Sequence, residues 1–313
     1  MVLKDSCGRP LLNLRVALTH RCNLRCEYCH KEGEEKSSGD SASEMSVDEI
    51  VRIVRIAVDL GISHVKLTGG EPLMRKDIVE IVKNIASVHG LAGLSMTTNG
   101  VMLSSLAKEL HKSGLKRVNI SLPTLNRDVY RKLTGGKLED VWEGVKAAVD
   151  AGLYPVKLNM VILKGVNDGD VLEMLDFARE TGTILQLIEL EPVNIDERYY
   201  AEYHKDLGEY EAMLKQKALN VETRRFMQSR QIYSLSDATV EVVHPIENTD
   251  FCLRCSRLRV TSDGKLKPCL MRSDNLVDIL TPMRDGASDQ ELVELFKLAN
   301  QRRQPYYQKK LNT

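Results

Sequence analysis

The sequence predicts an α/β protein built on a parallel sheet, and three observations lead to this fold class. Short β-rich runs alternate with amphipathic helical runs between residues 12 and 190, which is the pattern of repeated βα units. Several of the β-rich runs are almost continuously apolar, as in strands that are buried on both faces. Glycines end the helical runs, where a left-handed residue is favoured. Six such units make three quarters of an eight-unit barrel, so we predict a partial (βα)6 TIM-like barrel.

Each element of this barrel has a local signal. The strand candidates are rich in β-branched and apolar residues, and they are Leu12–Thr19, His64–Thr68, Leu94–Thr98, Arg117–Leu122, Pro155–Ile162 and Ile184–Leu190. The helix candidates repeat apolar residues at helical spacing, and they are Ser46–Leu60, Asp77–Ala86, Ser104–Lys112, Leu138–Ala151 and Asp168–Thr181. The first helix candidate opens with a capping box of Ser46 and Glu49, and Gly61 stops it. Gly114, Gly152 and Gly182 stand at the ends of three others.

The pattern changes after Leu190, so we divide the chain into a barrel of residues 1–190 and an α+β extension of residues 191–313. The extension predicts a helix over Ala201–Lys217, short strands within Val221–Val243 and a final helix over Gln290–Gln301. Two further strand candidates, Arg257–Thr261 and Lys265–Pro268, flank Asp263-Gly264. An Asp-Gly pair between two such runs indicates a β-hairpin.

The composition of the chain argues against some classes of function. The chain has 313 residues with 44 basic and 44 acidic side chains, so its formal net charge is zero. This balance excludes a globally basic nucleic-acid binder and leaves room for a local basic pocket. No apolar run reaches 18 residues, so we expect no transmembrane helix. We see no signal peptide and expect the reducing cytoplasm, where cysteines rarely form a disulfide framework.

Six of the seven cysteines form two groups of three. The first group is Cys22, Cys26 and Cys29, with the spacing C-x3-C-x2-C, and the second is Cys252, Cys255 and Cys269, with the spacing C-x2-C-x13-C. Such short spacings place several thiolates around one soft metal centre. Three ligands leave one coordination position open, whereas a closed structural zinc site has four. The seventh cysteine, Cys7, is interpreted as a small hydrophobic residue.

Other interpretations of these cysteines stay open on spacing alone. Cys26 to His30 matches the C-x-x-C-H pattern of c-type haem attachment, but that attachment normally accompanies export. A zinc ion could take His30 or Cys7 as the fourth ligand of the first group. A zinc ribbon is the corresponding alternative for the second group.

Longer motifs resemble the radical S-adenosylmethionine (SAM) superfamily. The resemblance rests on Arg15–Cys29 and on Gly69-Gly70-Glu71-Pro72 after the second strand. Within the superfamily, the chain resembles the GTP 3′,8-cyclase family of molybdenum cofactor biosynthesis, in its archaeal branch. The motifs that indicate this family within the superfamily are Leu67–Arg75, Thr97–Gly100, Lys157–Asn159, Lys164–Asp168, Gln186–Pro192 and Cys252–Cys269. Together they extend the resemblance over nearly the whole chain.

The resemblance implies two [4Fe–4S] clusters and SAM as cofactors. Cys22, Cys26 and Cys29 would hold the first cluster, and Cys252, Cys255 and Cys269 would hold the second. SAM would chelate the free iron of the first cluster, with contacts from Tyr28, Gly70 and Ser121. The glycines at 69 and 70 would let the main chain approach the methionyl amino group.

GTP is the substrate that the resemblance implies, with its guanine at the second cluster. The residues that match the family's GTP-binding positions are Arg15, Lys66, Thr97, Lys157, Arg257 and Arg259. Arginine suits phosphate because its guanidinium donates two parallel hydrogen bonds. Arg15 and Lys157 lie within apolar strand runs, where a charge needs a partner. Arg257 and Arg259 alternate with apolar residues and therefore share one strand face.

The implied reaction makes (8S)-3′,8-cyclo-7,8-dihydroguanosine 5′-triphosphate. A radical from SAM takes hydrogen from ribose C3′, the carbon radical attacks guanine C8, and no catalytic residue is expected beyond the clusters and SAM. The implied partners are the enzyme that makes cyclic pyranopterin monophosphate and a reductant for the clusters. A homodimer is one possible assembly. Neither nucleic acid nor a membrane is an expected partner. The alternatives are a radical SAM peptide maturase with an auxiliary cluster and a non-enzymatic zinc-binding protein.

The chain departs from the family pattern at four places. Pro123 stands where Asp is usual, and Lys66 stands where many members have Arg. Gln186 and Glu191 stand where many bacterial members have Arg and Met. The chain ends in Lys310–Thr313 and not in the Gly-Gly that is linked to activity in the family.

Overall fold

One twelve-stranded sheet organises the molecule. A computed structural model describes residues 2–34 and 44–307, so the tail at 310–313 lies outside it. The strands follow one another across the sheet in the order β12-β11-β10-β1-β2-β3-β4-β5-β6-β9-β8-β7. Their bounds are β1 Asn13–Ala17, β2 His64–Thr68, β3 Gly93–Thr98, β4 Arg117–Ser121, β5 Val156–Ile162, β6 Ile184–Glu189, β7 Asn220–Arg224, β8 Arg230–Ser234, β9 Thr239–Val243, β10 Arg257–Val260, β11 Lys265–Lys267 and β12 Val277–Asp278.

The six predicted barrel strands are present and parallel to their neighbours. β1 to β6 lie within two residues of the predicted bounds. The C-terminal part of the chain extends this sheet at both ends, because β9 pairs in parallel with β6 and β10 pairs in parallel with β1. The parallel part therefore has eight strands, two more than we predicted. The division at residue 190 stays a prediction.

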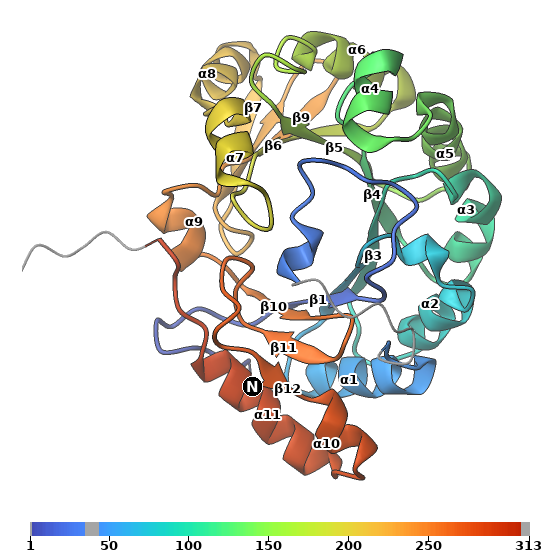
Figure 1. The fold of residues 1–313 in the computed structure, drawn as a ribbon, viewed down its shortest axis with the longest axis vertical. Helices are drawn as coiled ribbons and strands as arrows, with labels where there is room; N and C mark the ends of the chain where they lie inside the picture. Colours follow the sequence, from blue (N-terminus) through green and yellow to red (C-terminus); the bar gives the residue numbers. More distant parts are fainter. Residues whose placement is uncertain (1, 35–43, 308–313) are drawn as a thin grey trace, which may run out of the picture.

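Helices cover the outer, convex face of the curved sheet (Figure 1). Their bounds are α1 Val47–Asp59, α2 Ile78–Ala86, α3 Leu103–Lys112, α4 Arg127–Thr134, α5 Leu138–Asp150, α6 Val171–Thr181, α7 Glu197–Tyr203, α8 Gly208–Lys217, α9 Thr249–Leu253, α10 Leu280–Arg284 and α11 Asp289–Gln301. The predicted capping box is confirmed, because Ser46 and Glu49 exchange both hydrogen bonds. Gly182 ends α6 in a left-handed conformation with φ 65°, as predicted.

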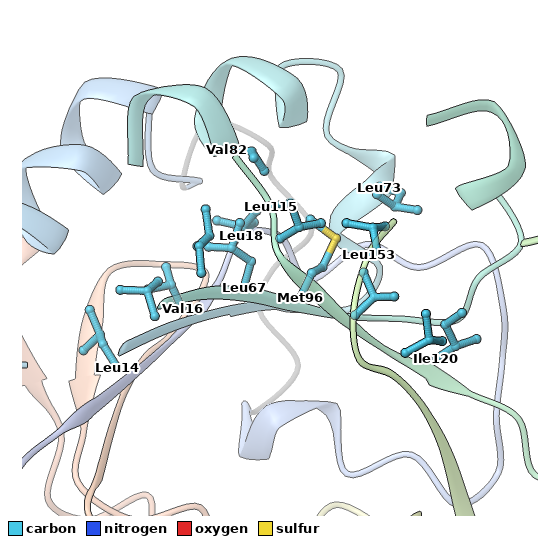
Figure 2. Packing of buried hydrophobic residues seen from close by; sticks show 14 of the residues in the cluster. Leu14, Val16, Leu18, Leu67, Leu73, Val82, Met96, Leu115, Ile120 and Leu153 are labelled. Atoms are coloured by element: carbon cyan, nitrogen blue, oxygen red, sulfur yellow. The ribbon is translucent and has the colours of Figure 1, made fainter. Parts of the chain in front are cut away.

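The main hydrophobic core lies between the strands and these helices. Figure 2 shows Leu14, Val16, Leu67 and Met96 packed together on this side of the sheet. Our expectation that several strands would be buried on both faces holds for much of β3, β4 and β6, but their buried residues are not all apolar. The alternate residues point to the inside of the curve, and many of them are polar, namely Asn13, Arg15, Lys66, Ser95, Thr97, Asn119, Ser121, Lys157, Asn159 and Gln186. The inner face therefore borders a polar cavity.

Several helical segments differ from the prediction, among them the short helices α9 and α10, which were not predicted. The sequence analysis did not predict α4, although Asn126 caps its start and Gly135 ends it with φ 74°. The single helix predicted over Ala201–Lys217 is two helices, α7 and α8. The break follows from tertiary contacts, because the His204 backbone is extended and the side chain of Leu207 is fully buried.

The C-terminal hairpin is confirmed. β10 and β11 pair antiparallel, and Gly264 in the connection has φ 73°. Among the helices of the described chain, none combines the length and apolar character that a membrane crossing requires.

Candidate active site

A single cavity of about 500 Å³ gathers the residues that the sequence analysis selected. All fifteen line it, and they are Arg15, Cys22, Cys26, Tyr28, Cys29, Lys66, Gly70, Thr97, Ser121, Lys157, Cys252, Cys255, Arg257, Arg259 and Cys269. They come from β1 to β5, from α9 and β10, and from the loops that follow β1, β2, α9 and β11. Cys7 is exposed and is not among the lining residues, so it offers no fourth ligand there.

The first cysteine group lies on the loop after β1, which crosses the inside of the curved sheet (Figure 1). Backbone hydrogen bonds tie the loop to the end of α4, from Arg25 N to Thr134 O at 2.9 Å and from Glu27 N to Leu133 O at 3.2 Å. Burial, together with the nearby Cys29 and Cys22, raises the pKa of the Cys26 thiol to about 12. The three thiols are therefore close enough to interact, and a bound cation would stabilise their thiolates.

Gly69 and Gly70 support this loop from the next strand. A Cβ atom built on Gly70 would overlap the Arg21 carbonyl oxygen and lie 2.6 Å from the His20 carbonyl oxygen. Gly70 N also donates to Thr19 O at 2.7 Å. These positions require glycine for a steric reason. The absence of a side chain lets the connection after β2 pack against the backbone before Cys22.

Glu71 and Asn99 form a second support that the sequence analysis did not recognise. The side chain of Glu71 is fully buried and accepts hydrogen bonds from Thr98 Oγ1 and Asn99 N, both at 2.7 Å. Burial raises the pKa of Glu71 to about 7. Asn99 Nδ2 donates to Asn23 Oδ1 at 2.7 Å, next to Cys22. Asn99 also forms a local turn, since its Oδ1 accepts from Val101 N at 3.1 Å.

Arginines surround the backbone of the second cysteine group. Arg303 Nη2 donates to the carbonyl oxygen of Cys255 at 2.6 Å, and Arg9 Nη1 donates to that of Cys252 at 2.8 Å. Burial alone would raise the pKa of the Cys255 thiol, but Arg303, Arg257 and Arg9 outweigh it and the pKa is lowered. No local signal marked Arg9 or Arg303, because their roles depend on contacts between distant parts of the chain.

The sulfur positions can be compared with the ligand spacing of a single zinc ion. Tetrahedral zinc places its sulfur ligands about 3.8 Å apart, given a Zn–S distance of about 2.3 Å. Among the described residues, which include all seven cysteines, three donor atoms lie within 4.8 Å of one another only in Glu189, Asp206 and His244. In neither cysteine group do the three sulfur atoms all lie as close together as the ligands of one zinc ion. A wider arrangement suits an iron–sulfur cluster, whose thiolates bind different irons.

A row of three cations lies on neighbouring strands. Arg259, Arg15 and Lys66 are register partners on β10, β1 and β2. Like charges at such positions repel one another. One carboxylate offsets part of this charge, since Glu32 Oε1 is 3.2 Å from Arg15 Nη1 and its Oε2 is 4.0 Å from Arg259 Nε. Burial would raise the pKa of Glu32, but Arg15 and Arg259 outweigh it and hold the pKa well below its ordinary value.

A second cation group surrounds Glu241 on β9. Arg230 Nη1 lies 3.2 Å and Arg224 Nη1 lies 3.4 Å from its carboxylate oxygens, and Lys157 also pairs with it. Burial would raise the pKa of Glu241, yet Arg230, Lys157 and Arg224 lower it to about 2. The sequence analysis selected only Lys157 of this group. Glu241 stands between Val240 and Val242 on its strand, and that alternation is the signal that could have identified it. Arg230 lies between the polar residues Ser229 and Gln231 and carries no such signal.

Several buried donor atoms in the cavity have no hydrogen-bond partner within the described chain. They are Arg259 Nε, Arg230 Nε and Gln186 Nε2. Arg257 makes no ion pair with any carboxylate of residues 2–34 and 44–307. Burial and the neighbouring Arg230 and Arg15 lower the pKa of Arg257. Unpaired buried donors and crowded cations fit an anion with many oxygen acceptors.

Family models match almost the whole chain. Residues 16–178 match the Radical SAM superfamily, and residues 183–309 match Molybdenum Cofactor Synthesis C. Two curated relatives are each named "Probable GTP 3′,8-cyclase". The relative from Thermococcus kodakarensis is 49% identical over 98% of this chain and 100% of its own length. The relative from Methanothermobacter thermautotrophicus is 47% identical over 98% of this chain and 99% of its own length.

Solved structures share the fold. Streptococcus suis SuiB superposes with a TM-score of 0.63 at 18% identity, over 96% of this chain and 68% of SuiB. The structure of anSMEcpe with bound AdoMet superposes with a TM-score of 0.61 at 17% identity, over 92% of this chain and 82% of that protein.

Proposed function

This chain belongs to the GTP 3′,8-cyclase family of radical SAM enzymes, and we propose that its cavity is the site where GTP is cyclised in molybdenum cofactor biosynthesis. One observation carries the assignment of the site. Both cysteine groups and seven basic side chains, Arg15, Lys66, Lys157, Arg224, Arg230, Arg257 and Arg259, line one cavity of about 500 Å³. A substrate held by these cations lies between the two cysteine groups.

SAM and a [4Fe–4S] cluster are the cofactors of this superfamily, and Cys22, Cys26 and Cys29 are the thiols that we assign to the cluster. When bound, the cluster and SAM supply the carbon-centred radical that takes hydrogen from the substrate. The chain orients the thiols through the supports described above, from Gly70 and Asn99. Tyr28, Gly70 and Ser121 line the same cavity, which supports them as SAM contacts.

We assign a second cluster to Cys252, Cys255 and Cys269. Their separation is wider than a single zinc ion allows, and Cys255 lies among arginines that favour its thiolate. Three protein ligands leave one position for a substrate atom, in accord with guanine binding there.

The triphosphate of GTP is the polyanion that the cations bind in this proposal. The row of Arg259, Arg15 and Lys66 places three positive charges side by side, so a chain of phosphates relieves their repulsion. Arg224 and Arg230 join the predicted set, because they share Glu241 with Lys157. Thr97 offers a hydroxyl on β3 at the same cavity.

The surroundings of the enzyme follow from the proposed reaction. The product passes to an enzyme that makes cyclic pyranopterin monophosphate, and an external reductant supplies electrons to the clusters. A homodimer is the assembly that we propose to test. The cytoplasm is the proposed location, because a reducing compartment keeps the seven free cysteines from forming disulfides.

The two alternatives have less support. SuiB bound to its precursor peptide shares 20% identity with this chain and therefore shows only a common fold. A zinc-binding protein would hold its thiols closer together than either cysteine group does.

Anaerobic turnover with GTP, SAM and dithionite tests the proposal. Wild-type protein should form cyclised nucleotide, and Cys26→Ala should abolish SAM cleavage. Cys255→Ala should keep part of the SAM cleavage and yield no cyclised nucleotide. Unchanged product from both variants would refute the assignment of the two cysteine groups.

A further inference from the structure

A cluster of imidazoles and carboxylates lies beside the active site. It joins Glu189 at the end of β6, Asp206 before α8 and His244 after β9, and the donor atoms of these three residues lie within 4.8 Å of one another. His244 Nε2 is 3.1 Å from Asp206 Oδ2 and 3.4 Å from Glu189 Oε2. Figure 1 shows the elements that carry it, near α7 and α9.

The cluster places two carboxylates around one imidazole nitrogen. His244 Nε2 has one proton at most and faces oxygens of two carboxylates. The carboxylate of Glu189 is almost fully buried, with 1% of its side chain exposed. Buried carboxylates need a cation or several hydrogen-bond donors.

The lining of the surrounding cavity includes histidines but no lysine or arginine of the described chain. Its lining residues in the described chain are Glu189, Tyr200, His204, Asp206, His244, Ile246, Glu247, Asn248, Thr249, Asp250 and Leu253. Four of these are carboxylates, and none is Lys or Arg. This local excess of acceptors stands out in a chain whose formal net charge is zero.

We propose that Glu189, Asp206 and His244 bind one divalent first-row metal ion such as Mn²⁺. Ligand atoms around such an ion lie about 3 Å apart when each is about 2.1 Å from the metal, and the three residues already approach this spacing. Carboxylates and imidazole together suit Mn²⁺, Fe²⁺ or Zn²⁺.

His204 completes the site from the second layer. Its Nε2 is 2.8 Å from Glu189 Oε1, the oxygen that does not face His244. A histidine in this position orients the carboxylate ligand, as groups behind metal ligands commonly do. Through His244, the ion would join the end of β6 to the segment that leads into α9 and Cys252. A hydrogen bond from Ile246 N to Glu189 Oε2 at 3.1 Å already links the same two segments.

Binding of Mn²⁺ to the iron-loaded protein tests this proposal. Mn²⁺ prefers oxygen and nitrogen ligands to thiolates, so it separates this site from the cysteines. The protein is treated with chelator, returned to buffer and titrated with Mn²⁺ in the absence of nucleotide. The amplitude of the electron paramagnetic resonance signal of free Mn²⁺ measures binding.

The variants are chosen to keep the fold. Asp206→Asn removes one ligand charge from a side chain that is 65% exposed, and its remaining oxygen still accepts from Gly208 N. Asp250→Asn is the matched control, because Asp250 lines the same cavity with 61% exposure and lies outside the cluster. His244→Gln removes the imidazole, and its urea unfolding midpoint shows whether it folds.

We expect one Mn²⁺ per chain in wild type and in Asp250→Asn, with affinity at least ten-fold weaker in Asp206→Asn. Folded His244→Gln should lose affinity by a similar factor. Absence of binding to wild type, or equal binding by wild type and Asp206→Asn, would overturn the proposal. Both results come from Mn²⁺ binding and not from cyclase activity. Failure of the metal-site proposal would therefore not count against the proposed function.

Discussion

Arg15 on β1 and Arg259 on β10 are register partners, and both reach the carboxylate of Glu32. The pairing brings residues from opposite ends of the chain to one wall of the cavity. A single carboxylate between two guanidiniums leaves positive charge for a ligand, and Lys66 on β2 adds to it. The positive charge of this cavity wall is therefore a property of the sheet register.

Arg257→Ala should weaken GTP binding and leave guanosine binding unchanged. Loss of one charge-assisted phosphate contact lowers affinity by about ten- to a hundred-fold. Equilibrium binding under anaerobic conditions measures both ligands. Arg127→Ala is the control, because Arg127 is exposed and pairs with Glu139 away from the cavity. Equal affinity of wild type for GTP and guanosine would mean that the phosphates are not recognised.

Glu241→Gln should destabilise the ligand-free protein by about 3–5 kcal/mol, because it leaves three cations without their buried carboxylate. Inorganic triphosphate should restore much of the loss by neutralising those cations. Denaturant unfolding with and without triphosphate measures both effects. A variant as stable as wild type would show that Glu241 does not balance this charge.

Acid should remove the difference between wild type and Glu241→Gln. The pKa of Glu241 is lowered from 4.5 to about 2, so its stabilising effect is complete above about pH 5 and is lost as the pH falls towards 2. Unfolding free energies at pH 7 and pH 3 measure the gap, and any cluster loss in acid affects both proteins. A gap of the same size at both values would contradict the assignment of the shift to this carboxylate.

Gly70→Ala should cost the first cluster and spare the second. The added methyl group would overlap the Arg21 carbonyl oxygen and displace the loop that carries Cys22. Iron content should fall by about half relative to wild type. Gly169→Ala is the matched control, because no atom lies within 4 Å of the position that its Cβ would take. Full iron content in Gly70→Ala would show that the loop tolerates the shift.

Iron analysis of the wild-type protein tests the cofactor assignment as a whole. Two clusters correspond to about eight iron and eight sulfide per chain. Replacing Cys252, Cys255 and Cys269 by alanine should remove half of both. Protein with stoichiometric zinc and little iron would refute the cluster assignment.

The local signals were sufficient for the repeating part of the fold. Apolar runs and capping residues predicted β1 to β6 and five of the helices, because those elements are shaped by nearby residues. The break between α7 and α8 escaped prediction, since it depends on contacts of His204 and Leu207 with distant elements. The parallel pairing of β9 and β10 was missed for the same reason.

The candidate site was only partly visible in the sequence. Cysteine spacing predicted two metal centres, and family resemblance selected the cations Arg15, Lys66 and Arg257. The counter-charges Glu32 and Glu241 were missed, because a buried carboxylate becomes meaningful only when its cationic neighbours are known. Arg303 was missed likewise, since it meets the Cys255 carbonyl group across 48 residues of sequence.

The pairing of β10 with β1 also bears on how the chain is made. β1 is synthesised before the other strands of the sheet, but its partner on one side appears only at Arg257. Until then β1 has an open edge, and β6 has another until Thr239 emerges. Open edges invite pairing with other chains. A nascent or truncated chain that stops near residue 190 is therefore exposed to aggregation at both ends of its sheet, and chaperones would have to cover those edges during translation.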